Sequence, residues 1–175
     1  YVMTNLPQAQ QDTISKLLGR TGELIQMDRL DEAERYLDEI LKKKPDEINV
    51  SFLRGTLFLK KGEPEKAIEQ FLSVHEKLPR FLGNLSNIAT TYFMLKKYND
   101  AVVYYKDYLA IEPKADIILA SLAACYYRLN DLDESIKYFR EALKISPQMD
   151  KMASNILVAM IYAESVTPEE QAEEA

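Results

Sequence analysis

The stretch LSNIATTYFMLKKYNDAVVYYKDYLAIEP, residues 85–113, is matched in design by LASLAACYYRLNDLDESIKYFREALKISP, residues 119–147. Corresponding positions in the two stretches are 34 residues apart, and the prolines that close them continue a ladder along the chain: Pro45, Pro79, Pro113 and Pro147. A fixed period of about 20–50 residues is typical of repeat proteins. The chain is therefore predicted to be an array of similar units.

Other residue types keep the same step, so a chance spacing of prolines does not explain the pattern. Two series of small residues and two of bulky residues advance by 34: Ala33, Ala67, Ala101 and Ser135; Thr21, Gly55, Ala89 and Ala123; Leu37, Phe71, Tyr105 and Phe139; Leu24, Phe58, Tyr92 and Tyr126. Small side chains are expected where two helices approach closely, and large ones fill the space beside them. Each proline is expected to end a unit, because it lacks an N–H and clashes with the preceding helical turn.

This pattern resembles the tetratricopeptide repeat (TPR) family, and the match is best over residues 85–113 and 119–147. The first two units depart from the family pattern. No unit has the family's tryptophan, Arg20 and Arg54 stand where leucine is usual, and only Gly55 keeps the glycine. Atypical terminal repeats are common in such arrays. The resemblance implies an all-α fold, a right-handed α-solenoid of antiparallel helix pairs that form a TPR superhelix.

The period divides the chain into four repeats with a segment on either side. We expect residues 1–13 to be an irregular lead-in or the start of the first helix, and the repeats to occupy residues 14–47, 48–81, 82–115 and 116–149. Residues 150–166 are predicted to form a capping helix, because the last repeat of a solenoid exposes an apolar face. An acidic disordered tail is expected over residues 167–175. Second helices are predicted to begin near Asp31, Pro64, Asn99 and Asp131.

The composition favours a soluble helical protein, with 29% charged residues, 47% hydrophobic residues and five glycines. No stretch approaches the ~20 apolar residues that cross a bilayer, and residues 1–11 lack the basic and apolar regions of a signal peptide. One cysteine excludes a disulfide within the chain. These observations predict a cytoplasmic location, with a periplasmic location as the alternative if an export signal has been removed.

Residues that carry catalysis or metal binding are sparse. His75 is the only histidine and Cys125 the only cysteine, so both are interpreted as structural. The carboxylates of residues 31–39 are interpreted as a solvated helix face, and the glycosylation motifs at Asn49 and Asn84 as chance matches. A formal charge of −6 opposes binding to a phosphate backbone. We therefore predict a chain that is not an enzyme and that uses no metal, no cofactor and no nucleic acid.

The resemblance also implies a binding site. In TPR arrays the first helices of successive units line a concave groove that holds an extended peptide or a partner helix. The eight residues predicted to form the binding site lie just off the packed face of those helices: Asn49, Phe52, Thr56, Asn87, Thr90, Phe93, Tyr127 and Arg128. Ile25 is expected on the same face of the first of these helices. One TPR subclass binds acidic chaperone peptides through a clamp of lysines, arginines and asparagines on these helices. The two comparable rows here contain no cation, which argues against such a clamp: Leu18, Phe52, Ser86 and Ala120; Gly22, Thr56, Thr90 and Ala124.

Asn49 and Asn87 are expected to hydrogen-bond a peptide backbone, while Phe52, Phe93 and Tyr127 would form apolar pockets for its side chains. For Phe52 and Tyr127, packing between repeats is an equal alternative. The predicted function is a non-catalytic scaffold or adaptor for a protein or peptide partner. Two alternatives are a dedicated chaperone, similar to the TPR chaperones of type III secretion, and the N-terminal recruitment domain of a larger enzyme. The apolar residues in 150–166 also suit a homo-oligomer contact.

Overall fold

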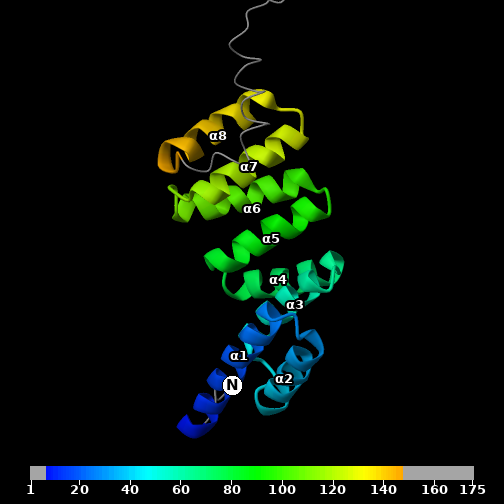
Figure 1. The fold of residues 1–175 in the computed structure, drawn as a ribbon. Helices are drawn as coiled ribbons and strands as arrows, with labels where there is room; N and C mark the ends of the chain where they lie inside the picture. Colours follow the sequence, from blue (N-terminus) through cyan, green and yellow to red (C-terminus); the bar gives the residue numbers. More distant parts are fainter. Residues whose placement is uncertain (1–6, 148–175) are drawn as a thin grey trace, which may run out of the picture. The chain divides into compact units, whose positions relative to one another are not determined.

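The computed structural model describes residues 7–147, which form eight helices and contain no strand (Figure 1). The described residues divide into two compact units, residues 7–95 and residues 96–147. The first unit holds α1 (Gln8–Gln26), α2 (Leu30–Lys43), α3 (Ile48–Lys60), α4 (Pro64–Lys77) and α5 (Leu82–Met94). The second holds α6 (Tyr98–Ile111), α7 (Asp116–Arg128) and α8 (Leu132–Ile145). The predicted capping helix, residues 150–166, and the acidic tail, residues 167–175, lie outside the described residues.

The bounds of the helices repeat with the period read from the sequence. Helices α2, α4, α6 and α8 begin at residues 30, 64, 98 and 132 and end at residues 43, 77, 111 and 145, so each bound advances by 34. These starts lie within one residue of the predicted ones. The residue before each proline is the C-cap of a helix and lies outside the helical region, with φ between −127° and −146° and ψ between 69° and 91° at Lys44, Leu78, Glu112 and Ser146. Proline imposes that conformation on its predecessor, which confirms its predicted role in ending the units.

The turn after each first helix has the same geometry in every repeat. A left-handed residue stands at the same register position each time, with φ of 60°, 73°, 59° and 61° at Asp28, Gly62, Lys96 and Asn130. In three of these turns the next N–H donates at 2.9 Å to a carbonyl five residues back, as in a Schellman motif. Glycine adopts this conformation without strain, and a lysine there costs roughly 1 kcal/mol.

The predicted small-residue series are buried. Ala33, Ala67, Ala101 and Ser135 have no exposed surface. In the other series, a Cβ added to Gly55 would lie 2.6 Å from a ring carbon of Phe71, so a side chain at this position conflicts with the ring. The two series therefore mark the places where helices approach most closely, as the sequence predicted.

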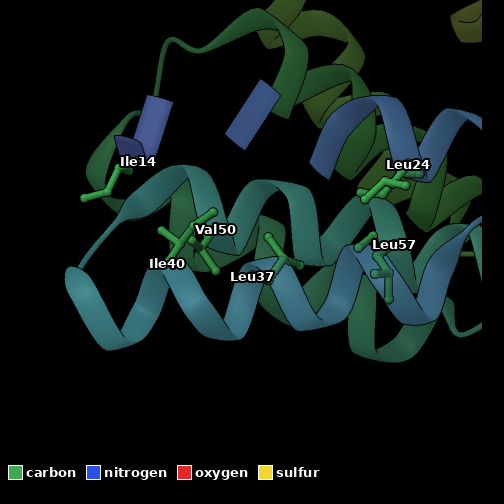
Figure 2. Close-up of a cluster of buried hydrophobic side chains, with 8 residues drawn as sticks. Ile14, Leu24, Leu37, Ile40, Val50 and Leu57 are labelled. Carbon is green, nitrogen blue, oxygen red and sulfur yellow. The ribbon is translucent and has the colours of Figure 1, made fainter. Parts of the chain in front are cut away.

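One core cluster of the first unit draws its side chains from α1, α2 and α3. Figure 2 shows Ile14 and Leu24 of α1, Leu37 and Ile40 of α2, and Val50 and Leu57 of α3 gathered between those helices. Burial of each large aliphatic side chain contributes about 1.5–3 kcal/mol. Ile25 belongs to the same cluster and is only 2% exposed, so its prediction as a groove residue is wrong. The reason is that α1 contacts α3 as well as α2, which closes that side of α1.

Two ion pairs join α2 to α3 and to the residue that follows it. Arg54 binds Asp38 at 2.7 Å, and Lys61 binds Glu34 at 2.6 Å. Both carboxylates are at least partly exposed, as the interpretation of residues 31–39 as a solvated face expected, and each also pairs with a cation because α2 packs against the following helix. Arg54 departs from the family's usual leucine, and this pairing gives the arginine a partner. Partly exposed pairs of this kind contribute about 0–1 kcal/mol each.

Three candidate reactive or modified residues, Cys125, Asn84 and His75, are at least half-buried in the fold. Cys125 is fully buried in α7, and burial raises the pKa of its thiol to about 12. Asn84 is also fully buried and donates its amide to the Phe71 carbonyl at 2.9 Å, so this glycosylation motif is inaccessible in the fold. His75 lies half-buried near the end of α4. Within residues 7–147, no helix has both the length and the apolar character needed to span a membrane.

Candidate peptide-binding surface

In the first unit, the first helices of successive repeats are neighbours: α3 contacts both α1 and α5. Along these helices, Thr21, Gly55 and Ala89 are buried, whereas the residues directly after them are half-buried or exposed: Gly22, Thr56 and Thr90. We call the accessible surface of α1, α3 and α5 the first-helix face and define it by Gly22, Asn49, Phe52, Thr56, Asn87, Thr90 and Phe93. On each of the three helices, a buried residue of the core is thus followed directly by a residue of this surface.

Three predicted residues lie on α3. Asn49 is exposed, and both its backbone N–H and its side-chain amide donate to the Glu47 carboxylate, at 3.2 and 2.6 Å. Phe52 is half-buried, with its ring centroid 5.0 Å from that of Phe81 and 6.0 Å from that of Phe71. Thr56 is half-buried, and its hydroxyl donates to the Phe52 carbonyl at 3.1 Å. Phe52 therefore packs against aromatic neighbours and still keeps part of its surface accessible.

Three more predicted residues lie on α5. Asn87 and Phe93 are half-buried and Thr90 is exposed. All 13 residues of α5 are uncharged. On α3 the only charges are Arg54, which is paired with Asp38, and Lys60 at the end of the helix. On α3 and α5 the first-helix face is therefore largely uncharged, in a chain of formal charge −6, whereas α1 carries the exposed charges Asp12, Lys16, Arg20 and Glu23.

The last two predicted residues lie in the other unit. Tyr127 and Arg128 end α7, where both are exposed, Tyr127 by 40%. The structure thus brings six of the eight predicted residues together in the first unit. Their role in binding stays a prediction. No group of metal-ligating side chains occurs among residues 7–147.

The sequence prediction missed a buried carboxylate beside this surface. Glu47 is 8% exposed and caps α3 by accepting the Asn49 N–H, and it also binds Lys44 at 2.8 Å. Burial acts to raise the pKa of Glu47, but the hydrogen bonds from Lys44 and Asn49 outweigh it, so the pKa lies below its ordinary value. The spacing of Lys44 three residues before a glutamate at the predicted helix start was the available signal.

Comparison with known proteins places these helices in a family. Three models described as tetratricopeptide repeat match residues 23–79, 85–111 and 117–149. No curated protein matches the chain in sequence.

Several solved structures share the fold at low sequence identity. PilF of Pseudomonas aeruginosa matches with a TM-score of 0.78 and 15% identity, over 90% of this chain and 71% of that one. MamA from Desulfovibrio magneticus RS-1 matches with a TM-score of 0.77 and 18% identity, over 87% and 86% of the two chains. A chain of the APC/C hetero-tetramer Cut9-Hcn1 matches with a TM-score of 0.76 and 19% identity, over 85% of this chain and 30% of that one. These likenesses establish the all-α solenoid fold.

The three family matches together cover most of residues 23–149, and the helix bounds in that range advance by 34 residues, the period of the TPR unit. The chain belongs to the tetratricopeptide repeat family.

Proposed function

We propose that the chain is a non-catalytic protein-interaction scaffold that binds an extended segment or a helix of a partner protein along the first-helix face. Membership of the TPR family supports an interaction scaffold in general. Binding along this face is supported by one observation. The buried residues Thr21, Gly55 and Ala89 are each followed directly by an accessible residue on α1, α3 and α5. The Cut9-Hcn1 hetero-tetramer, which contains a chain of similar fold, is consistent with a role in assembly.

The surface offers groups that suit a peptide. Phe52 and Phe93 are half-buried, so each keeps accessible aromatic surface for an apolar side chain. The amide of Asn87 and the hydroxyl of Thr90 would hydrogen-bond a peptide backbone. A Cβ added to Gly22 would meet nothing within 4 Å, so there is open space above α1 at this point. A partner side chain would fill that space.

Substitutions on this face test the proposal. Phe93→Glu and Thr90→Glu place a charge on an uncharged surface, and Ser73→Glu places the same charge at an exposed position of α4, a second helix. The full chain and each variant would be used to capture partners from an extract of the source cells, with quantitative mass spectrometry. We expect one or more proteins to be lost from both face variants and kept by Ser73→Glu, with unchanged circular dichroism.

A steric variant gives an independent test without a change of charge. Gly22→Leu fills the open space on α1, and replacing a glycine within a helix favours the helix by about 0.5–1 kcal/mol. We therefore expect partner capture to fall while the melting temperature stays level or rises. Capture of the same proteins by Gly22→Leu, Phe93→Glu, Thr90→Glu and Ser73→Glu would contradict the proposal. Neither alternative function, secretion chaperone or recruitment domain, has a supporting observation of its own within residues 7–147.

A further inference from the structure

The connection between α4 and α5 differs from the matching connections in the described part of the chain. It reads Leu-Pro-Arg-Phe at residues 78–81, whereas residues 44–47 read Lys-Pro-Asp-Glu and residues 112–115 read Glu-Pro-Lys-Ala. Leu78 is 44% exposed and Phe81 is 37% exposed. Two large apolar side chains therefore stand in solvent at positions where the other connections carry polar or small residues.

The aromatic residue occupies the position of a helix cap. Phe81 is the N-cap of α5 and provides no side-chain hydrogen bond, whereas Glu47 at the matching position caps α3. Replacing a capping side chain by an apolar one costs about 0.5–2 kcal/mol. Ala115 before α7 also makes no cap, but it exposes no large apolar group. A helix start that gives up its capping group for a partly exposed ring breaks a local rule, and such breaks are typical of functional positions.

The Phe81 ring packs against a second ring, which contacts a buried third one. Its centroid lies 5.0 Å from that of Phe52, which in turn lies 6.0 Å from that of Phe71, a fully buried ring. Gly83 is exposed, and a Cβ there would lie 3.2 Å from the Phe81 ring and 3.8 Å from the Phe52 ring. The missing side chain leaves the edges of both rings open. Rigid aromatic groups lose little conformational entropy on binding, which is why they dominate interaction hot spots.

The charged residues next to Leu78 and Phe81 in the sequence are mainly positive. Lys77 and Arg80 are exposed and take part in no ion pair among residues 7–147. Glu76 is the one carboxylate in residues 76–94. A local excess of cations in a chain of formal charge −6 is complementary to an acidic partner segment.

We infer that Leu78, Phe81 and Phe52, flanked by Lys77 and Arg80, form a docking point for a partner segment in which a bulky apolar residue adjoins one or more carboxylates. We call these five residues the loop patch. Phe52 lies in the first half of α3 and Phe81 directly precedes α5, so the loop patch adjoins the starting ends of two helices of the first-helix face. The inference rests on the proposed function and specifies the chemistry of the segment bound at that end.

Three fluorescein-labelled peptides of equal length would test the chemistry. The first carries Asp-Glu on each side of a central phenylalanine in a glycine–serine background, the second replaces the phenylalanine by alanine, and the third replaces the acids by lysines. Binding to the full chain would be measured by fluorescence anisotropy. We expect the first peptide to bind at least about tenfold more tightly than the other two. Equal affinities for the three peptides, or no binding of the first, would overturn the inference.

Two variants connect the binding to the loop patch. Phe81→Ser removes the ring, supplies a hydroxyl at the N-cap of α5 and adds no charge, so we expect a level or higher melting temperature and at least about a tenfold loss of affinity for the first peptide. Arg80→Glu should weaken the first peptide and strengthen the lysine peptide. Ser73→Glu serves as the control and should bind like the parent chain. An unchanged affinity of Phe81→Ser for the first peptide would contradict the assignment.

The natural partner separates this inference from the proposed function. Capture that is lost by Gly22→Leu and kept by Phe81→Ser would uphold the first-helix face and reject the loop patch. Capture that is lost by Phe81→Ser and kept by Gly22→Leu would uphold the loop patch and reject binding along the face. Loss in both variants supports both proposals, and capture by both variants rejects both.

Discussion

The helix pairs α3–α4 and α7–α8 share one register, and yet they close their narrowest contact in different ways. In α3–α4 the missing side chain of Gly55 leaves room for the ring of Phe71. In α7–α8 an alanine, Ala123, takes the glycine's position, and the hydroxyl of Ser135 donates to its carbonyl at 2.8 Å. The position in the repeat therefore fixes the size of the side chain, while the chemistry that joins the helices is free to differ.

Removal of the large side chain should have the largest effect. Phe71→Ala leaves a cavity in a fully buried site and is expected to lower the free energy of unfolding by about 3–5 kcal/mol. Phe139 at the matching position is 7% exposed, so Phe139→Ala should cost less. Urea denaturation followed by circular dichroism would measure both. Equal losses would mean that the two contacts are packed alike, contrary to this comparison.

A single methyl group tests the glycine contact. Gly55→Ala places a carbon 2.6 Å from the buried Phe71 ring, and we expect a loss of about 1–3 kcal/mol despite the better helix propensity of alanine. Gly22→Ala is the matched control, because nothing lies within 4 Å of its new carbon, and it should gain about 0.5–1 kcal/mol. The melting temperatures of the two variants should move in opposite directions. A Gly55→Ala protein as stable as the parent would show that Phe71 moves aside freely.

The caps of the two first helices differ in their response to pH. Glu47 caps α3, and its pKa is lowered because the hydrogen bonds from Lys44 and Asn49 outweigh the opposing effect of burial, whereas Ala115 before α7 has no titrating group. A carboxylate whose pKa is lowered by folding stabilises the protein at every pH above the pKa of the unfolded state. That stabilisation is lost as the pH falls through the pKa of the folded state.

We therefore expect Glu47→Gln to cost about 0.5–2 kcal/mol at neutral pH. The melting temperatures of the parent chain and the variant, recorded from neutral to acidic pH, should converge as the pH falls. A constant difference at every pH would mean that the charge of Glu47 contributes nothing to the cap.

The smallest effect is expected from an exchange of the hydroxyl. Ser135→Ala places in α8 the residue type that α4 has at the matching position, Ala67. It should lower the free energy of unfolding by about 0.5–1.5 kcal/mol, the usual net contribution of one hydrogen bond. Ala67→Ser introduces the hydroxyl into α3–α4 and reports whether it reaches the Gly55 carbonyl. A loss above the range given for Ser135→Ala would indicate that the hydroxyl also supports the packing of Ala123.

The sequence predicted the fold in detail because the packing constraints repeat. Four prolines and two series of small residues each mark one structural position, and every described copy of that position is filled as expected. The starts of the second helices were predicted to within one residue for the same reason. Such agreement between separate series is typical of sequences whose local and global preferences coincide.

The candidate surface was less predictable, because its positions vary from repeat to repeat. Ile25 reads as a groove residue by register, but contact of α1 with two helices buries it. Glu34 and Asp38 were predicted to be solvated, and their ion-pair partners, Lys61 directly after α3 and Arg54 within it, were not predicted. The exposure of Phe81 depends on the path of one connection. Features that depend on non-repeated contacts of this kind leave no periodic signal.

The burial of Cys125 gives this protein a built-in reporter. Its thiol is the only one in the chain, it has no exposed surface, and its pKa of about 12 leaves almost no thiolate at neutral pH. Alkylating reagents therefore reach it only when the surroundings of α7 open, and the labelling rate in native buffer measures how often that happens. A partner that binds and stabilises this unit would slow the labelling. The rate at which Cys125 is alkylated therefore reports local opening of the second unit.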